Sequence, residues 1–313
     1  MRLCRFGTED MPRVGLYSEQ GIVPLAGAAG AAGIDTPVMQ SPHLLDFLPA
    51  GAGFEAAREA AAWVLKNFDA LPANLKLDPT KTSVLVPVPS PRKIFLLAGN
   101  YAEHIREGGG IAEERQNTFP YVFMKPSTTL TNPGAAIKIP KAAPDAVDWE
   151  LELGVIIGRT VKAVSEEKAL EAVAGYTVIN DISQRKYTPN PNRKPRDKDK
   201  FFDWLHGKWF DTFCPVGPCV LSADDLPDPQ TLKMTLKLNG EVRQDSTTGA
   251  MIFPVASLIA FISQMVTLEP GDIICTGTPA GVGHTTNTFL KPGDVMTGYI
   301  EKIGTLVTPV AAE

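Results

Sequence analysis

The chain has 313 residues, 44% of them hydrophobic and 21% charged, which is typical of a globular protein with one large domain or a main domain and an appendage. Its net charge of −5 argues against a general nucleic-acid binder and against a polybasic membrane binder. No apolar run reaches the ~20 residues of a membrane span, and the first residues lack the apolar segment of a signal peptide, so we expect a cytoplasmic protein.

Residues 1–90 predict a small α+β domain. Three short strands are expected within the first 25 residues, and the Gly/Ala-rich stretch 26–33 is interpreted as a loop. Residues 54–69 predict a helix. Its apolar face would carry Phe54, Ala57, Ala61, Val64, Leu65 and Phe68. The proline-rich segment 85–93 cannot continue a helix, so we place a domain boundary near residue 90.

Residues 91–313 predict the larger, mostly β domain. Helices are expected from about 100 to 108, with Asn100 as the cap, from Ser165 to about Gly175, and over 254–268. Strands dominate towards the end of the chain, where Pro-Gly turns occur at 268–272 and 290–294. Because strands and helices do not alternate regularly, an α+β fold is favoured over a doubly wound sheet.

The four cysteines give no sign of a disulfide framework or a zinc site. They are Cys4, Cys214, Cys219 and Cys275. None forms a C-x-x-C pair, and their spacing is wide, so we interpret all four as buried or incidental thiols.

Two glutamates interrupt an otherwise apolar strand in the segment "VDWELELGVIIG", residues 147–158. Side chains two apart on a strand share a face, so Glu150 and Glu152 would lie close together. An edge strand with one face in water is the ordinary explanation. However, Asp181 ends another apolar strand that could lie alongside. Three carboxylates without histidine or thiolate suit Mg²⁺, Mn²⁺ or Ca²⁺ and disfavour zinc.

Two further groups could take part in catalysis. His104 and Glu107 are three residues apart on a predicted helix and can touch, which makes His104 a candidate general base; a surface His–Glu pair is the alternative. The glycines at 108–110 suggest that this helix belongs to a mobile lid. Lys208, in an aromatic-rich segment, could neutralise an anionic group in a pocket.

Three other residues are weaker candidates for substrate contacts. Lys125 and Arg185 offer positive charge near strand ends, although each could be an ordinary surface charge. The segment "CTGTPAGVG", 275–283, matches no phosphate-binding loop and no helix pattern follows it, so we do not expect nucleotide binding. Its Thr278 and backbone amides could still bind a carboxylate.

Together these motifs resemble the fumarylacetoacetate hydrolase family over about residues 91–305. The motifs, in chain order, are "AGNYAEHIRE", "FMKPS", "DWELELGVIIG", "INDIS" followed by an arginine, "GKWFDTFCPVGP" and "TGTPAGVG". The resemblance implies a β-rich roll built on a mixed sheet, a small N-terminal domain and a homodimer.

The resemblance also implies roles for the candidate residues. Glu150, Glu152 and Asp181 would hold Mg²⁺ or Mn²⁺, with Ca²⁺ as a substitute. His104 and Glu107 would form a lid dyad that activates water, and Lys208 would be the active-site lysine. Lys125, Arg185 and Thr278 would lie around the substrate. The segment between Asp181 and Lys208 is longer than expected for compact members, and we interpret its basic part, 193–200, as a solvated loop.

The implied activity is the hydrolysis of a carbon–carbon bond in small, anionic β-diketo acids of the acylpyruvate or fumarylacetoacetate type. Isomerisation or decarboxylation of 2-hydroxy-dienedioates or oxaloacetate is the nearest alternative, because it would use the same metal and the same enolate. A non-catalytic Ca²⁺-stabilised domain is a third possibility, but it leaves Lys208, His104 and Glu107 without a role.

Overall fold

The computed structural model describes residues 1–313 and shows a mostly β protein with seven α-helices. Its main feature is an 11-stranded mixed sheet in the order β3-β2-β1-β13-β11-β10-β16-β5-β6, with β4 beside β1 and β7 beside β13. The strands are β1 (Arg2–Thr8), β2 (Met11–Ser18), β3 (Gly21–Pro24), β4 (Val84–Leu85), β5 (Ile94–Ala98), β6 (Tyr121–Met124), β7 (Leu130–Thr131), β10 (Leu151–Ile157), β11 (Val173–Asn180), β13 (Cys214–Ser222) and β16 (Ile273–Cys275). The predicted mixed-sheet α+β class is confirmed.

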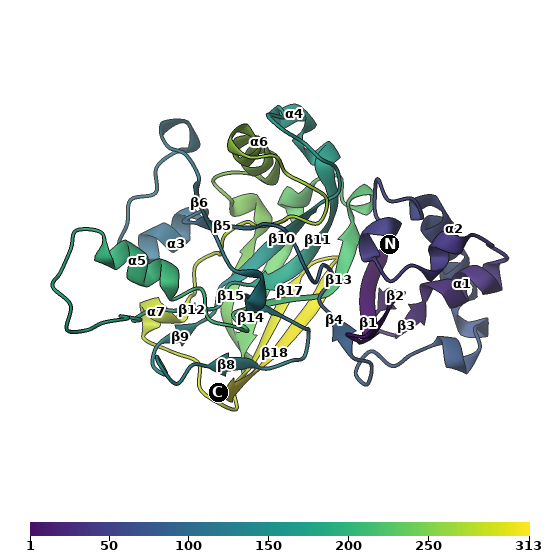
Figure 1. Ribbon diagram of the computed structural model, residues 1–313, viewed down its shortest axis with the longest axis horizontal. Coiled ribbons are helices and arrows are strands. Elements are labelled where there is room, and N and C mark those ends of the chain that lie inside the picture. Colours follow the sequence, from purple (N-terminus) through teal and green to yellow (C-terminus); the bar gives the residue numbers. More distant parts are fainter.

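Two smaller sheets complete the β-structure. A five-stranded sheet has the order β15-β14-β17-β18-β8, and β12 pairs with β9. Their strands are β8 (Ile137–Ile139), β14 (Lys233–Leu238), β15 (Glu241–Thr247), β17 (Val295–Ile300) and β18 (Gly304–Ala312), with β9 (Val147–Asp148) and β12 (Ser183–Gln184). In Figure 1, helices α1 (Leu25–Ala32) and α2 (Phe54–Asn67) lie at one end of the molecule, and α3 (Ala102–Glu107), α5 (Asp199–His206) and α7 (Gly283–Thr286) lie at the other.

The core strand β10 is buried along its whole length because both faces of the large sheet are covered. Leu151, Leu153 and Val155 join a core that includes the five-stranded sheet. Ile156, on the opposite face, joins a second core that contains residues of α1 and α2. This double burial explains the nearly continuous apolar sequence of β10.

The Gly/Ala-rich segment predicted as a loop is in fact helix α1, Leu25–Ala32, so that prediction was wrong. Alanine has the highest helix propensity, and Leu25, Ala28 and Ala29 gain burial. Gly33 ends the helix with a φ of 75°, a left-handed conformation that glycine adopts at no steric cost. The β1 strand pairs with β13 of the larger region; the boundary near residue 90 stays a prediction.

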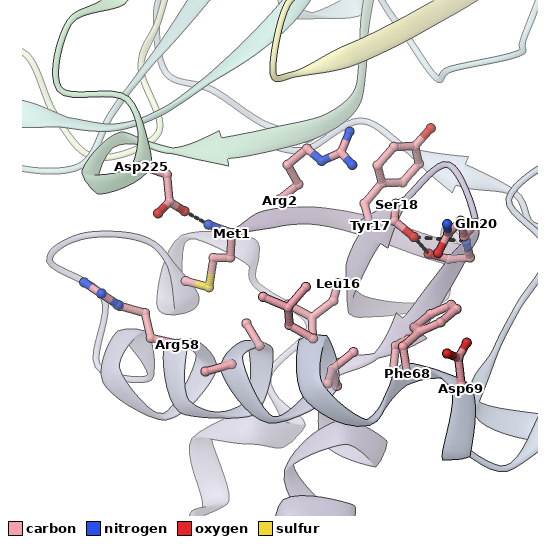
Figure 2. A pocket seen from close by; sticks show the side chains of 16 residues that line it. Met1, Arg2, Leu16, Tyr17, Ser18, Gln20, Arg58, Phe68, Asp69 and Asp225 are labelled. Carbon is pink, nitrogen blue, oxygen red and sulfur yellow. Dashed lines mark hydrogen bonds and ion pairs between the residues drawn. The ribbon is translucent and has the colours of Figure 1, made fainter.

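Helix α2 is present as predicted, but its buried face is not the predicted one in full. Ala57 and Val64 are buried as expected and Ala60 is buried as well, whereas Leu65, which was expected on this face, is 84% exposed. A groove of about 640 Å³ lies between α2 and the N-terminal strands, as Figure 2 shows. At one end of this groove the amino group of Met1 pairs with Asp225.

Three other local predictions need correction. Asn100 does not cap α3, because its amide donates to the carbonyls of Phe253 and Thr276. The helix after Ser165 is only α4 (Glu166–Ala169) with one 3₁₀ turn, because β11 starts at Val173. The short helix α7 begins at the end of the 275–283 segment, where no helix was expected. The buried carboxylate of Asp148 accepts hydrogen bonds from the first two amides of this helix.

Other predictions hold. Helix α6 spans Val255–Met265, and Gly271 and Gly293 have φ of 88° and 95° in the two Pro-Gly turns. All four cysteines are buried and free. The basic segment is held on α5 by Arg193, whose Nε donates to Asp199 at 2.9 Å. No helix is both long enough and apolar enough to cross a bilayer.

Candidate active site

Three carboxylates meet at one end of β10 and β11. Glu150 precedes β10, Glu152 lies on it, and Asp181 follows β11, whose Asn180 pairs with Leu151. One carboxylate oxygen from each lies within 4.8 Å of the others, and all three side chains are buried. The structure therefore brings together the three residues that the sequence marked as an oxygen-donor metal site.

Two of these carboxylates are neutralised by buried cations. The ammonium Nζ of Lys208 lies 2.8 Å from Glu150 Oε2 and 2.6 Å from Asp181 Oδ2. Arg185 Nη2 is 2.6 Å from Glu150 Oε1. Burial alone would raise the pKa of Glu150, but the charges of Lys208 and Arg185 hold it below its usual range. Glu150 is therefore ionised before any metal binds.

Glu152 differs because no cation of the protein pairs with it. Its Oε2 accepts a hydrogen bond of 2.8 Å from the amide of Gly277, and its buried Oε1 has no partner. Gly277 has a φ of 87°, a conformation that glycine adopts without strain. Burial, together with the negative charges of Asp181 and Glu150, raises the pKa of Glu152 well above its usual value.

This unpartnered oxygen is the best evidence that the triad suits a metal. Buried polar atoms normally have a hydrogen-bond partner, so a buried carboxylate oxygen without one indicates a position where a cation could bind. Three carboxylate ligands form a hard donor set of the kind that Mg²⁺ and Mn²⁺ use, and the set does not distinguish between them. The triad of Glu150, Glu152 and Asp181 could hold either ion.

The histidine–glutamate pair forms as expected. His104 Nδ1 is 2.8 Å from Glu107 Oε1. The other oxygen of Glu107 accepts from the amide of Gly281 at 2.9 Å and from the hydroxyl of Thr285 at 3.3 Å. Although burial opposes it, these contacts hold the pKa of Glu107 below its usual value. The 275–283 segment connects the pair to the triad, because its Gly281 amide donates to Glu107 and its Gly277 amide donates to Glu152.

The remaining candidates already have partners within the protein. Lys125 Nζ donates to the carbonyls of Ile182 at 2.9 Å and Phe213 at 2.6 Å, and it also contacts Asp181. The hydroxyl of Thr278 donates to the carbonyl of Leu151 at 2.9 Å. Lys125 and Arg185 thus support the carboxylates, while Thr278 fastens the glycine-rich loop to β10.

Three supporting residues were missed. Asn180 Oδ1 accepts from the amide of Glu150 at 2.8 Å, and Gln244 accepts from Leu151 at 3.0 Å while donating to Thr278. Asp148 contacts Arg185. Asp148 could have been found, because it precedes Glu150 by two residues in the same alternating pattern. Nothing in the sequence around Gln244 on β15 signals its contact with β10.

Comparisons with known proteins match one family over most of the chain. Residues 93–311 match the family model described as fumarylacetoacetate (FAA) hydrolase C-terminal. The mitochondrial oxaloacetate tautomerase of Xenopus laevis is 35% identical over 99% of this chain and 90% of its own. The 2,4-didehydro-3-deoxy-L-rhamnonate hydrolase of Sphingomonas sp. (strain SKA58) is 37% identical over 97% of this chain and 94% of its own.

Solved structures show the same fold over the full length. Fumarylacetoacetate hydrolase from Exiguobacterium antarcticum has a TM-score of 0.73 and 27% identity, with 100% of both chains covered. Maleylpyruvate hydrolase from Sphingobium sp. SYK-6, in complex with manganese(II) and pyruvate, has a TM-score of 0.72 and 29% identity, covering 100% of this chain and 99% of that one.

Proposed function

Because the chain belongs to the fumarylacetoacetate hydrolase family, we propose that it is a Mg²⁺- or Mn²⁺-dependent hydrolase that cleaves a carbon–carbon bond in small β-diketo acids of the acylpyruvate type. The observation that carries this proposal is the His104–Glu107 pair, joined at 2.8 Å and connected to the carboxylate triad through the 275–283 segment, which donates to Glu107 and to Glu152. A base next to a metal site is what the activation of water requires.

The protein's own residues account for the proton transfers. Glu107, anchored by Gly281 and Thr285, fixes the His104 ring through Nδ1, which leaves Nε2 free to take a proton from water. The hydroxide adds to the distal carbonyl carbon, the carbon–carbon bond breaks to give a carboxylic acid and the enolate of a 2-oxo acid, and the enolate takes up the proton that His104 received from water. Lys208 would stabilise negative charge on oxygen near the triad. A bound Mg²⁺ or Mn²⁺ would supply Lewis-acid stabilisation of the 2-oxo acid end.

A named hydrolase relative supports this substrate class. The maleylpyruvate hydrolase of Sphingobium was solved with manganese(II) and pyruvate. Pyruvate is a 2-oxo acid, and it is the fragment that cleavage of an acylpyruvate would release. Lys208 and Arg185 already pair with Glu150, so a bound metal would be the main positive charge for a small anionic 2-oxo acid.

Tautomerisation of oxaloacetate, or isomerisation of a related dienedioate, is the second candidate. It is favoured by the relatives named oxaloacetate tautomerase, such as that of Xenopus laevis, and by the solved 2-hydroxyhepta-2,4-diene-1,7-dioate isomerase of Mycobacterium marinum, which is 28% identical. These reactions move a proton between carbon and oxygen without consuming water. They would use the same triad and the same histidine.

A substrate panel separates the two candidates. We expect the Mn²⁺-loaded protein to release pyruvate and a carboxylic acid from an acylpyruvate series, at a kcat/KM higher than that for oxaloacetate or 2-hydroxyhepta-2,4-diene-1,7-dioate. Product acids are measured by chromatography and keto–enol conversion by ultraviolet absorbance. Fast tautomerisation of oxaloacetate without acylpyruvate cleavage would contradict the hydrolase proposal and support the second candidate.

We also propose that the protein forms a homodimer through the free edge of β6. This strand ends the large sheet, and its Tyr121 is 63% exposed. An apolar cavity of about 590 Å³ lies along it. The lining residues include Phe119, Phe201, Trp204, Phe261 and Met265. Exposed edge strands and large apolar patches are typical association sites.

Light scattering tests this proposal directly. We expect the wild-type protein to have twice the mass of the chain and Tyr121→Asp to shift it towards the monomer, because a charge would be buried in the interface. Met11→Asp, an exposed apolar residue of β2, is the matched control and should stay dimeric. A monomeric wild-type protein would refute the proposal.

A further inference from the structure

One buried carboxylate, that of Asp148, joins parts of the site that are far apart in the sequence. Asp148 lies on β9 and is completely buried. Its Oδ1 accepts from the amides of Trp149 at 2.8 Å and Gly283 at 2.7 Å. Its Oδ2 accepts from the amide of His284 at 3.0 Å and from Arg185 Nε at 2.8 Å. Four donors thus hold both oxygens.

One set of these contacts leads to the triad. β9 pairs with β12, and this pairing places Ser183 opposite Asp148. Arg185 is the first residue after β12, so the pairing also brings it close to Asp148. Arg185 uses Nε for Asp148 and places Nη2 2.6 Å from Glu150 Oε1. Because the guanidinium group is planar and rigid, fixing one side by Asp148 fixes the side that faces Glu150.

The other set of contacts leads to the histidine–glutamate pair. The amides of Gly283 and His284 begin helix α7, whose Thr285 donates to Glu107. A Cβ atom at position 283 would lie 2.7 Å from Asp148 Oδ1, so the approach requires glycine there. In Figure 1, α7, β9 and β12 lie at the same end of the molecule as α3.

We propose that Asp148 is a positioning residue that holds the carboxylate triad and the His104–Glu107 pair in fixed positions relative to each other. It acts through Arg185 on Glu150 and through α7 on Glu107. This inference rests on the proposed function, in which the triad holds the metal and His104 acts on water. It adds that both groups depend on one carboxylate that contacts neither the reacting atoms nor the metal. The loss of that carboxylate should loosen both groups at once.

Asp148→Asn is the sharpest variant because it changes charge and hydrogen bonding but hardly changes volume. In one orientation the amide NH₂ faces the N–H groups of His284 and Arg185, and in the other it faces those of Trp149 and Gly283. In either orientation the NH₂ group faces two N–H donors, and the hydrogen bonds to those two donors are lost. Partners of metal ligands typically contribute about 10–100-fold to metal affinity or activity.

The test uses the full-length protein and two measurements that need no substrate. We expect Asp148→Asn to weaken Mn²⁺ binding, measured by titration calorimetry, by about 10–100-fold. We also expect faster amide hydrogen exchange in α3, residues 102–107. The matched control is Asp272→Asn, another fully buried aspartate, which pairs with Lys93 at 2.9 Å at the opposite end of β10. This control should lower Tm without changing Mn²⁺ affinity or α3 exchange.

The outcomes separate the proposal from a general loss of stability. Wild-type Mn²⁺ affinity and wild-type α3 exchange in Asp148→Asn would overturn it, as would equal effects in Asp272→Asn. If Asp148→Asn does not fold, Thr285→Val tests the α7 connection alone. It should speed exchange in α3 and leave Mn²⁺ affinity unchanged, and wild-type exchange in that variant would also overturn the proposal. Absence of acylpyruvate cleavage by the wild type would refute the proposed function but leave both measurements interpretable.

Discussion

Replacing Glu152 with glutamine should abolish Mg²⁺ and Mn²⁺ binding and, with it, turnover of every substrate in the panel. Glu152 is the one triad member without a cation of the protein beside it, and its Oε1 has no hydrogen-bond partner. A neutral amide removes a charged ligand, so the loss should exceed the about 10–100-fold typical of an outer partner. Titration calorimetry with Mn²⁺ and assays with and without chelator measure both effects.

The pH dependence of stability gives an independent readout of the same residue. Because the pKa of Glu152 is raised, the unfolded chain loses this proton at a lower pH than the folded protein. The metal-free protein should therefore lose stability as pH rises from about 4.5, the ordinary carboxyl value, towards the folded pKa of Glu152. Mn²⁺ binding displaces the proton, so the rise in Tm that Mn²⁺ causes should grow as pH rises from the ordinary carboxyl value towards the folded pKa of Glu152.

Two controls make this prediction specific. Glu152→Gln should show neither the Mn²⁺-induced rise in Tm nor its growth with pH, while Asp272→Asn should keep both. Glu150 cannot produce the same pattern, because its pKa is lowered and its contribution to stability is complete above the ordinary carboxyl value. Full activity of the wild-type protein in excess chelator would refute the metal-dependent mechanism.

The centre of the site could be predicted from the sequence because local periodicity encodes it. Strand alternation puts Glu150 and Glu152 on one face, and helical spacing puts Glu107 beside His104. The pairing of Leu151 with Asn180 then brings Asp181 to the same place. These predictions need only the strand and helix periodicities and the assumption that two strands are adjacent. The functional roles of these residues stay predictions until the variants are measured.

The supporting contacts could not be predicted because they join residues that are distant in sequence. Asp148 accepts from Gly283, which is 135 positions away, and Gln244 accepts from Leu151, which is 93 positions away. No local period reports such contacts. Helix α1 was a different failure: its alanines favour a helix, but its two interior glycines suggested a loop. Burial of Leu25, Ala28 and Ala29 decided in favour of the helix.

Replacing His104 with alanine should damage hydrolysis far more than decarboxylation. Hydrolysis of an acylpyruvate consumes water, which must lose a proton as it attacks the carbonyl, whereas loss of CO₂ from oxaloacetate consumes no water. General bases typically contribute about 10²–10⁴-fold to rate. We therefore expect kcat for acylpyruvate cleavage to fall by about that factor, while any oxaloacetate decarboxylation falls much less. Steady-state assays with Mn²⁺ measure both reactions on the same preparation.

Glu107→Gln shows whether the imidazole acts as a base or only fills space. The Glu107 carboxylate accepts from the amide of Gly281 and contacts His104 Nδ1, so its loss misorients the ring without removing it. We expect a smaller fall in hydrolysis than for His104→Ala, and no change in Mn²⁺ affinity. His43→Ala, at an exposed histidine of the N-terminal region, is the matched control and should match the wild type. Equal damage to both reactions in His104→Ala would mean that this histidine shapes the pocket and does not activate water, and the hydrolase proposal would then lose its mechanistic support.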